Sequence, residues 1–117
     1  MKHLSHRFKL GRTSKHRIAL RYNLARSLIL HGKIVTTEAK AKFLSPMVEK
    51  LVTLAKKKDL ESYRYILSSL RGDEVSSQKL VSEYANKFKD RNGGYLKTVK
   101  IGSRIGDSAA KSLVFFT

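Results

Sequence analysis

Cysteine and tryptophan are absent from this 117-residue chain, and proline occurs once. Without cysteine the chain forms no disulfide and carries no thiolate nucleophile, a composition that fits a reducing cytoplasm. No run approaches 18 consecutive apolar residues, and the first residues lack the apolar segment of a signal peptide. We therefore expect a cytoplasmic protein that neither spans a membrane nor enters the secretory pathway.

Acidic residues are also scarce. Nine Asp and Glu stand against 25 Lys and Arg, which gives a formal net charge of +16. A field of this size draws a protein to nucleic acid or to an anionic membrane. Residues 1–42 hold 11 of the Lys and Arg but a single acidic residue, so the N-terminal third carries most of the excess. The length leaves room for one domain with a modest core.

The four histidines, His3, His6, His16 and His31, lie in the same third of the chain. Cysteines and nearby carboxylates that would complete a metal site do not accompany them. The chain also lacks the spacing of a nucleophile with its base, of a phosphate loop or of a metal motif. We therefore expect no enzyme, no catalytic residue, no metal and no cofactor.

Residues 1–13 are a basic arm with too little apolar surface to order itself. Its cations are interleaved with Phe8 and histidine rings, which suits a strand threading between RNA helices, where phosphates pair with Lys and Arg and rings stack on unpaired bases. A solubilising tail is the alternative, but it needs no such density of cations. The candidate contacts here are Lys2, His3, His6, Arg7, Lys9 and Arg12.

Residues 14–30 have the apolar spacing of an amphipathic helix whose second half packs inward and whose first turns are cationic. Cations at the positive end of the helix dipole cost about 0.3–1 kcal/mol each, and a bound phosphate resolves this conflict. The alternative is a solvated helix end on which arginine stems cover apolar neighbours. We take as candidate contacts Ser14, Lys15, His16, Arg17 and Arg21.

Gly32 predicts the end of this helix, and the β-branched run 33–37 predicts a strand. Thr36 or Thr37 can cap a second helix whose apolar register continues across Pro46. A single kinked helix is the first choice, and a separate helix that begins at Pro46 is the alternative. The candidate basic surface extends over Lys33, Thr36, Thr37, Lys40 and Lys42.

A third helix is expected over residues 59–72, capped by Asp59 and with an inward face formed by Leu60, Tyr63, Ile66, Leu67 and Leu70. A fourth helix is expected over residues 73–88. Two strands, 95–101 and 111–116, then flank the loop 102–110, which holds Arg104 as a further candidate contact. The continuous apolar run 113–116 predicts that the last strand lies inside the sheet or beneath helices.

The loop before these strands combines a cation with two glycines. Glycine permits positive φ and a close approach of the backbone to phosphates. A plain turn that enters a strand is the alternative. The candidate contacts in this loop are Arg91, Asn92, Gly93, Gly94 and Tyr95.

The expected order is helix, strand, three helices and two strands behind the basic arm. This order, with the motifs at residues 11–17, 33–37, 54–56, 91–95 and 106–107, resembles the family of the bacterial large-subunit ribosomal protein numbered seventeen along essentially the whole chain. The resemblance implies an α+β fold: a two-layer α/β domain over residues 14–117 with a three-stranded mixed sheet packed against helices on one face. It implies RNA contacts at His3, Arg12, Ser14, His16, Arg17, Arg21, Thr36, Thr37, Lys40 and residues 91–95.

The chain departs from the family pattern at Leu4, where a basic residue is usual, at Ile105, which replaces a common arginine, and at Ala110, which replaces a common proline. These departures fall on the arm and on the loop 102–110.

The residues and the resemblance together predict a structural constituent of the large ribosomal subunit. It would bind large-subunit (23S) rRNA near the rim of the exit tunnel, by shape, 2′-hydroxyls and phosphates more than by base edges. Neighbouring large-subunit proteins are the other expected partners, and we expect no membrane, no small-molecule substrate and no self-association. A nucleoid-type DNA-binding protein is the alternative, because charge alone does not separate DNA from RNA.

Overall fold

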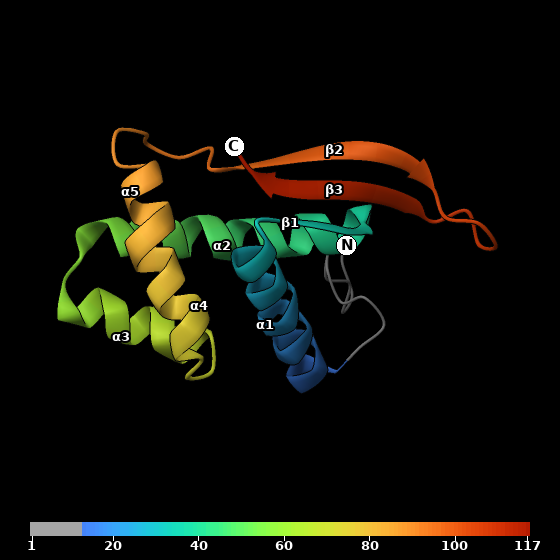
Figure 1. Cartoon of the computed structure of the whole chain (residues 1–117). Coiled ribbons are helices and arrows are strands. Elements are labelled where there is room, and N and C mark those ends of the chain that lie inside the picture. The colour runs from blue at the N-terminus through green and yellow to red at the C-terminus, as the bar shows by residue number, and fades with distance from the viewer. Residues whose placement is uncertain (1–12) are drawn as a thin grey trace, which may run out of the picture.

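The computed structural model describes residues 13–117. They form, in order, α1 (Ser14–His31), β1 (Lys33–Thr37), α2 (Glu38–Lys57), α3 (Leu60–Ser69), α4 (Glu74–Lys79), the π-helical segment η1 (Leu80–Tyr84), α5 (Ala85–Lys87), β2 (Leu96–Ser103) and β3 (Ala110–Phe116). The last three helical segments follow one another without a break and make one helical arm (Figure 1). The predicted α+β order of a helix, a strand, three helices and two strands is therefore confirmed.

The helix boundaries follow capping residues that the sequence indicated. Gly32 ends α1 with φ of 80°, in the left-handed region that glycine adopts without strain. Of the two threonines that could cap α2, Thr36 and Thr37, it is Thr37 that does so, and it accepts a hydrogen bond from the amide of Lys40 at 3.3 Å. Asp59 caps α3 and accepts from the amide of Ser62 at 2.7 Å. Each side chain satisfies an amide that the first turn of a helix leaves free.

Pro46 lies inside a single helix, which confirms the prediction of one helix across this segment rather than a separate helix that begins at Pro46. Proline has no amide hydrogen, so one bond of the helical ladder is missing at this point. In the adjacent turn the hydroxyl of Ser45 donates to the carbonyl of Ala41 at 2.8 Å. The apolar face of α2 continues on both sides of Pro46 and is buried on both sides, so tertiary packing holds the two halves in one helix.

The sheet has the order β1-β3-β2, and β3 runs antiparallel to both neighbours. The expected mixed sheet is therefore wrong. β3 returns along β2 as a hairpin and also pairs with β1, from Lys33 opposite Phe115 to Thr37 opposite Lys111. A central strand that opposes both of its neighbours leaves no parallel pair. The prediction that the last strand lies inside the sheet is confirmed.

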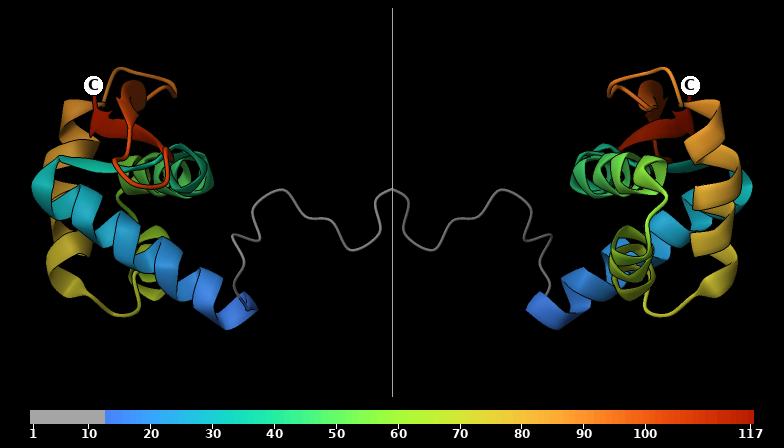
Figure 2. Two further views of the ribbon diagram at one scale, coloured as in Figure 1. Left: turned by 90° about the vertical axis from the view of Figure 1, so that its right-hand side faces the viewer. Right: turned by 90° about the vertical axis from the view of Figure 1, so that its left-hand side faces the viewer.

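Helix α2, seen nearly end-on in Figure 2, has the sheet on one side and α1 and α3 on the other, and the α4–α5 helix runs alongside it. Helix α2 supplies more of the buried aliphatic side chains than any other element, and the second half of α1, the α3 helix, the α4–α5 helix and β3 close around them. The core comprises Ala25, Leu28, Ile29, Ala41, Leu44, Val48, Leu51, Val52, Ala55, Ile66, Leu70, Leu80, Tyr84, Ala85, Phe88, Tyr95, Val114 and Phe116.

Some predicted details differ from the structure. Leu60, expected on the inner face of α3, is 63% exposed, because the first residue after the Asp59 cap faces outward. β2 begins at Leu96 and extends to Ser103, past a register shift after Lys100 that lengthens the hairpin. The expected fourth helix is present, but its middle is π-helical.

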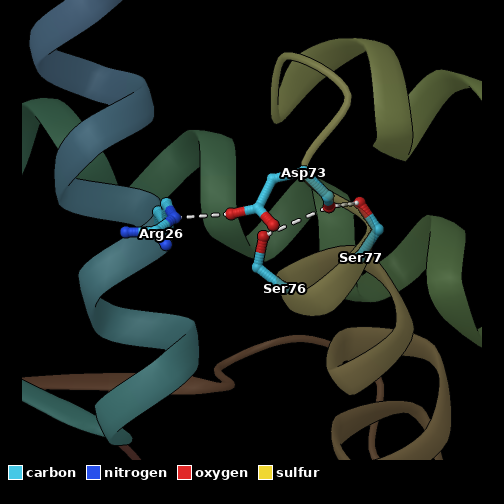
Figure 3. A network of polar contacts seen from close by, with 4 residues as sticks. All are labelled: Arg26, Asp73, Ser76 and Ser77. Atoms are coloured by element: carbon cyan, nitrogen blue, oxygen red, sulfur yellow. Dashed lines mark hydrogen bonds and ion pairs between the residues drawn. The ribbon is translucent and has the colours of Figure 1, made fainter.

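An ion pair joins α1 to the start of α4 (Figure 3). The Nε atom of Arg26 donates to a carboxylate oxygen of Asp73 at 2.5 Å, and the Asp73 carbonyl accepts from the hydroxyls of Ser76 at 3.4 Å and Ser77 at 2.7 Å. Partial burial acts to raise the pKa of Asp73, but the hydrogen bonds from Arg26 and Ser76 outweigh it and hold that pKa below its usual value. The ion pair thus holds the start of the α4–α5 helix against α1.

A double-mutant cycle with Arg26→Ala and Asp73→Asn tests this pair. We expect a coupling free energy of about 0.5–1 kcal/mol at pH 7, the range of a partly exposed ion pair. Because the folded-state pKa of Asp73 is lowered, the coupling is complete above the unfolded-state pKa of about 4 and is lost as the pH falls through the folded-state value. Urea unfolding of the four proteins at pH 7 and pH 2 measures it. Equal coupling at both pH values would contradict the assignment.

Candidate nucleic-acid interface

The start of α1 presents cations without any acidic residue in its first turn. Thr13 caps the helix and accepts from the amide of His16 at 3.3 Å, and Arg17 donates to the hydroxyl of Ser14 at 3.1 Å. The side chains of Ser14, Lys15 and His16 are exposed, and Arg17 is half-buried. Backbone amides, the helix dipole and these cations all favour an anion at this end.

One turn further along α1, Arg21 is positioned by α2. Its guanidinium lies over the ring of Phe43, with 4.2 Å from Cζ to the ring centroid. Its Nε atom is buried, without a hydrogen-bond partner among residues 13–117. Stacking on a buried ring therefore holds this arginine at the side of α1.

A second basic site lies where β1, α2 and the β2–β3 hairpin meet. A pocket of about 250 Å³ is lined there by Val35, Thr36, Thr37, Lys40, Arg104 and Lys111. Four of these were predicted contacts from two separate stretches of sequence, residues 36–40 and the loop that holds Arg104, and the fold brings them together. The pocket adjoins the first turn of α2, where the free amides add to the charge of the three cations.

Lys111 is the member of this pocket that sequence reasoning missed. It stands opposite Thr37 in the β1–β3 register, so the strand pairing carries it to the start of α2. Nothing within residues 110–116 distinguishes Lys111 from an ordinary strand lysine. Only knowledge that β3 pairs with β1 could have identified it as a residue of this pocket.

Arg104 is held at the end of the hairpin by Asp107. Its Nε donates to one carboxylate oxygen at 3.1 Å, and its Nη2 donates to the other. This pairing, with a hydrogen bond from the Ala109 amide, lowers the pKa of Asp107 to about 2. The turn is closed by the Arg104 amide, which donates to the Ala109 carbonyl at 2.7 Å. The arginine therefore projects from an ordered turn rather than from a loose loop.

Two predicted lysines lie elsewhere. Lys42 pairs with Glu38 at 3.3 Å and faces a groove between α2 and the hairpin. Lys33 is exposed at the start of β1, opposite Phe115 of β3. Neither lines the pocket around Lys40.

The loop 91–95 lies at the opposite end of the domain from the hairpin turn (Figure 1). Gly93 and Gly94 have φ of 94° and 64°, as a glycine turn requires. Lys56 reaches the loop from α2, donating to the Tyr95 hydroxyl at 3.0 Å and to the carbonyl of Arg91. The hydrogen bond from Lys56 also lowers the pKa of Tyr95.

Tyr95 is 1% exposed and belongs to the core, with its ring 5.1 Å from that of Phe88. Its part in an interface is therefore to position the loop. Arg91 and Asn92 are exposed, and the guanidinium of Arg91 donates to the hydroxyl of Thr117.

Apart from Lys33 and Lys42, the candidate residues between 13 and 117 gather at three places: the start of α1, the pocket around Lys40, and the loop 91–95. None of the helices between residues 13 and 117 combines the length and apolar character needed to cross a bilayer. Within the same residues, no three His, Cys, Asp or Glu side chains are grouped as a metal ion would require.

Comparison with known proteins identifies a family. Residues 20–117 match the family model described as ribosomal protein L17. The large ribosomal subunit protein bL17 of Hyphomonas neptunium is 50% identical over 110 residues, which cover 93% of this chain and 77% of that protein. The bL17 proteins of Trichlorobacter lovleyi and Neorickettsia sennetsu are each 43% identical, over 97% and 99% of this chain and 91% and 99% of their own lengths.

Replacement of Arg104 tests the order of the hairpin turn. In Arg104→Ala the pKa of Asp107 should rise from about 2 toward the ordinary aspartate value, because its largest stabilising contact is lost. Carbon-detected NMR titration of the side-chain carboxyl measures this. Lys111→Ala is the control, since it removes a nearby cation that is not paired with Asp107 and should leave the pKa low. An unchanged titration in Arg104→Ala would assign the low pKa to the backbone instead.

Proposed function

This chain belongs to the ribosomal protein L17 family, and from that membership we propose that it is a structural constituent of the large ribosomal subunit and not an enzyme. Its partners are then ribosomal RNA and neighbouring ribosomal proteins, and its place is with the ribosome in the cytoplasm. Family membership supports these proposals. The proposed RNA contacts of individual residues are supported by charge and geometry.

We propose that the chain binds large-subunit (23S) rRNA mainly through phosphates. The observation that carries this is the pocket where Lys40, Arg104 and Lys111 surround the first turn of α2. Three cations and a helix N-terminus converge on one small volume, and a phosphate is the anion that pairs with all of them. The cationic start of α1 offers a second contact of the same kind.

The remaining candidate contacts extend this surface. Lys33 and the loop 91–95 lie apart from the pocket, so an RNA that touched all of them would wrap the domain. The arm residues would add phosphate contacts, although they lie outside the residues that the structure describes: Lys2, His3, His6, Arg7, Lys9 and Arg12. We retain residues 1–13 as an arm and 14–117 as one domain, placed near the exit-tunnel rim and without self-association.

Salt dependence tests the phosphate-dominated mode. With roughly 6 to 10 phosphate contacts, affinity for large-subunit rRNA should fall about 10³- to 10⁵-fold between 50 and 200 mM salt, because bound cations are released from the RNA. Filter binding or fluorescence anisotropy across this range gives the slope. A flat titration rejects the mode, and equal affinity for duplex DNA would favour a nucleoid-type DNA-binding protein.

The pocket is tested by Lys40→Ala combined with Lys111→Ala. The loss of two phosphate contacts should weaken rRNA binding at 100 mM salt and reduce the salt slope by roughly two. The matched control is Lys57→Ala combined with Lys89→Ala, which removes the same charge from exposed lysines outside the pocket. Equal weakening in both double variants would show that net charge, and not the pocket, determines affinity.

A further inference from the structure

A larger groove lies beside the pocket, between α2 and the β2–β3 hairpin. It has a volume of about 570 Å³, within the range of ligand sites. One wall is α2, with Glu38, Lys42 and Pro46, and the other is β2, with Thr98 and Lys100. The groove is separate from the pocket around Lys40, with which it shares no lining residue.

The floor of the groove holds a polar group that the fold leaves unsatisfied. Ser112, on the central strand β3, lines the groove and is 0% exposed. Its hydroxyl has no hydrogen-bond partner within residues 13–117. A buried hydroxyl without a partner is unfavourable in a folded protein, and such groups are uncommon. A ligand that supplied a partner would remove this penalty.

The rim of the groove combines an acceptor with two donors. The Glu38 carboxylate is shared by Lys42 at 3.3 Å and Lys100 at 3.6 Å. The hydrogen bond from Lys42 and the charge of Lys100 lower the pKa of Glu38, so this acceptor stays ionised at neutral pH. The two ammonium groups exceed the one carboxylate, and both lysine side chains are mostly exposed. The rim can therefore receive an anion and a hydrogen-bond donor together.

Lys100 lies directly across from Ser112 on the neighbouring strand. The two residues are direct cross-strand partners in the β2–β3 register, so their side chains lie on the same face of the sheet. The Lys100 side chain is 76% exposed and is held toward Glu38 by a single ion pair. If Lys100 paired with an external anion instead, Glu38 would keep its ion pair with Lys42 and lose the one with Lys100.

We propose that this groove binds one unpaired nucleotide of the large-subunit rRNA, a partner that rests on the function proposed above. The phosphate pairs with Lys42 and Lys100, and an amino or imino group of the base donates to Glu38. The Ser112 hydroxyl bonds a base edge or the ribose 2′-hydroxyl. Unpaired bases expose these groups, whereas the bases of an RNA duplex do not. An anion joined to a flat ring with N–H donors matches the rim better than a protein segment, because the chain as a whole is strongly cationic.

The test compares variants of the full chain on large-subunit rRNA transcribed in vitro. Ser112→Ala should lower affinity about 3- to 10-fold, because it removes a hydrogen bond to the RNA. The same change should leave the thermal midpoint of the free protein unchanged or raise it, since it deletes an unsatisfied buried hydroxyl. A purely structural serine would lower the midpoint instead, and that result would overturn the proposal.

Lys100→Ala and Lys97→Ala form a matched pair on one strand. Lys97 is opposite Phe115 on the outer face of the sheet, whereas Lys100 faces the groove. We expect Lys100→Ala to weaken binding more, although both changes remove one charge. Chemical probing of the RNA should show one unpaired nucleotide that the wild type protects, that Lys97→Ala still protects, and that Ser112→Ala and Lys100→Ala leave reactive.

The outcomes separate this proposal from the broader one. If the wild type does not bind rRNA, the proposed function fails. If the wild type binds with a steep salt slope but Ser112→Ala is neutral and the two lysine variants weaken binding equally, only the nucleotide groove is rejected. If groove variants bind rRNA normally but block the joining of a neighbouring ribosomal protein in reconstituted subunits, the occupant is a protein and the proposal is overturned.

Discussion

Burial of one face of α2 is the interaction on which both layers of the domain depend. Leu44, Val48, Leu51 and Val52 are at most 1% exposed, and burying each such side chain contributes roughly 1.5–3 kcal/mol before entropy is counted. The sheet packs on this helix from one side and α1 and α3 from the other, while the α4–α5 helix runs alongside it up to the level of the sheet (Figure 2). Because the core fixes the rotation of α2, it also fixes where the polar residues of that helix point. Lys40 faces the hairpin pocket, and Glu38 and Lys42 face the groove beside β2.

Features of the fold that depend on near neighbours in the chain were predictable from the sequence. Gly32 and Asp59 mark helix ends through their own backbone or side-chain chemistry, so no distant contact is needed to recognise them. The apolar register across Pro46 predicted one helix because burial of a continuous face outweighs one missing hydrogen bond. The unbroken apolar run of β3 predicted its place inside the sheet, and β3 is the central strand. Only one of its faces is fully buried, because Leu113 and Phe115 on the other face are half-buried.

Features that depend on pairing between distant segments were not predictable in the same way. Strand direction could not be read from strand composition. The mixed sheet was expected only from the family resemblance, and an antiparallel one was found. Lys111 joins the basic pocket only because β3 pairs with β1. Ser112, Glu38 and Lys100 form the groove from three elements, and none of them has an unusual sequence context. Residues of the start of α1 were recognisable because their conflict with the helix dipole is local.

Two unfavourable features of the free protein have the same physical explanation. The first turn of α1 has cations and no acidic residue, which costs about 0.3–1 kcal/mol for each cation. The unpartnered hydroxyl of Ser112 costs about 1–3 kcal/mol. A domain selected only for stability would have a carboxylate in the first turn of α1 and an alanine at position 112. Small domains are stable by only about 5–15 kcal/mol, so such terms are a substantial fraction, and the core around α2 must offset them. Under the proposed function, a bound anion with hydrogen-bonding groups would make both features favourable, and the stability of this domain would then be coupled to its affinity for rRNA.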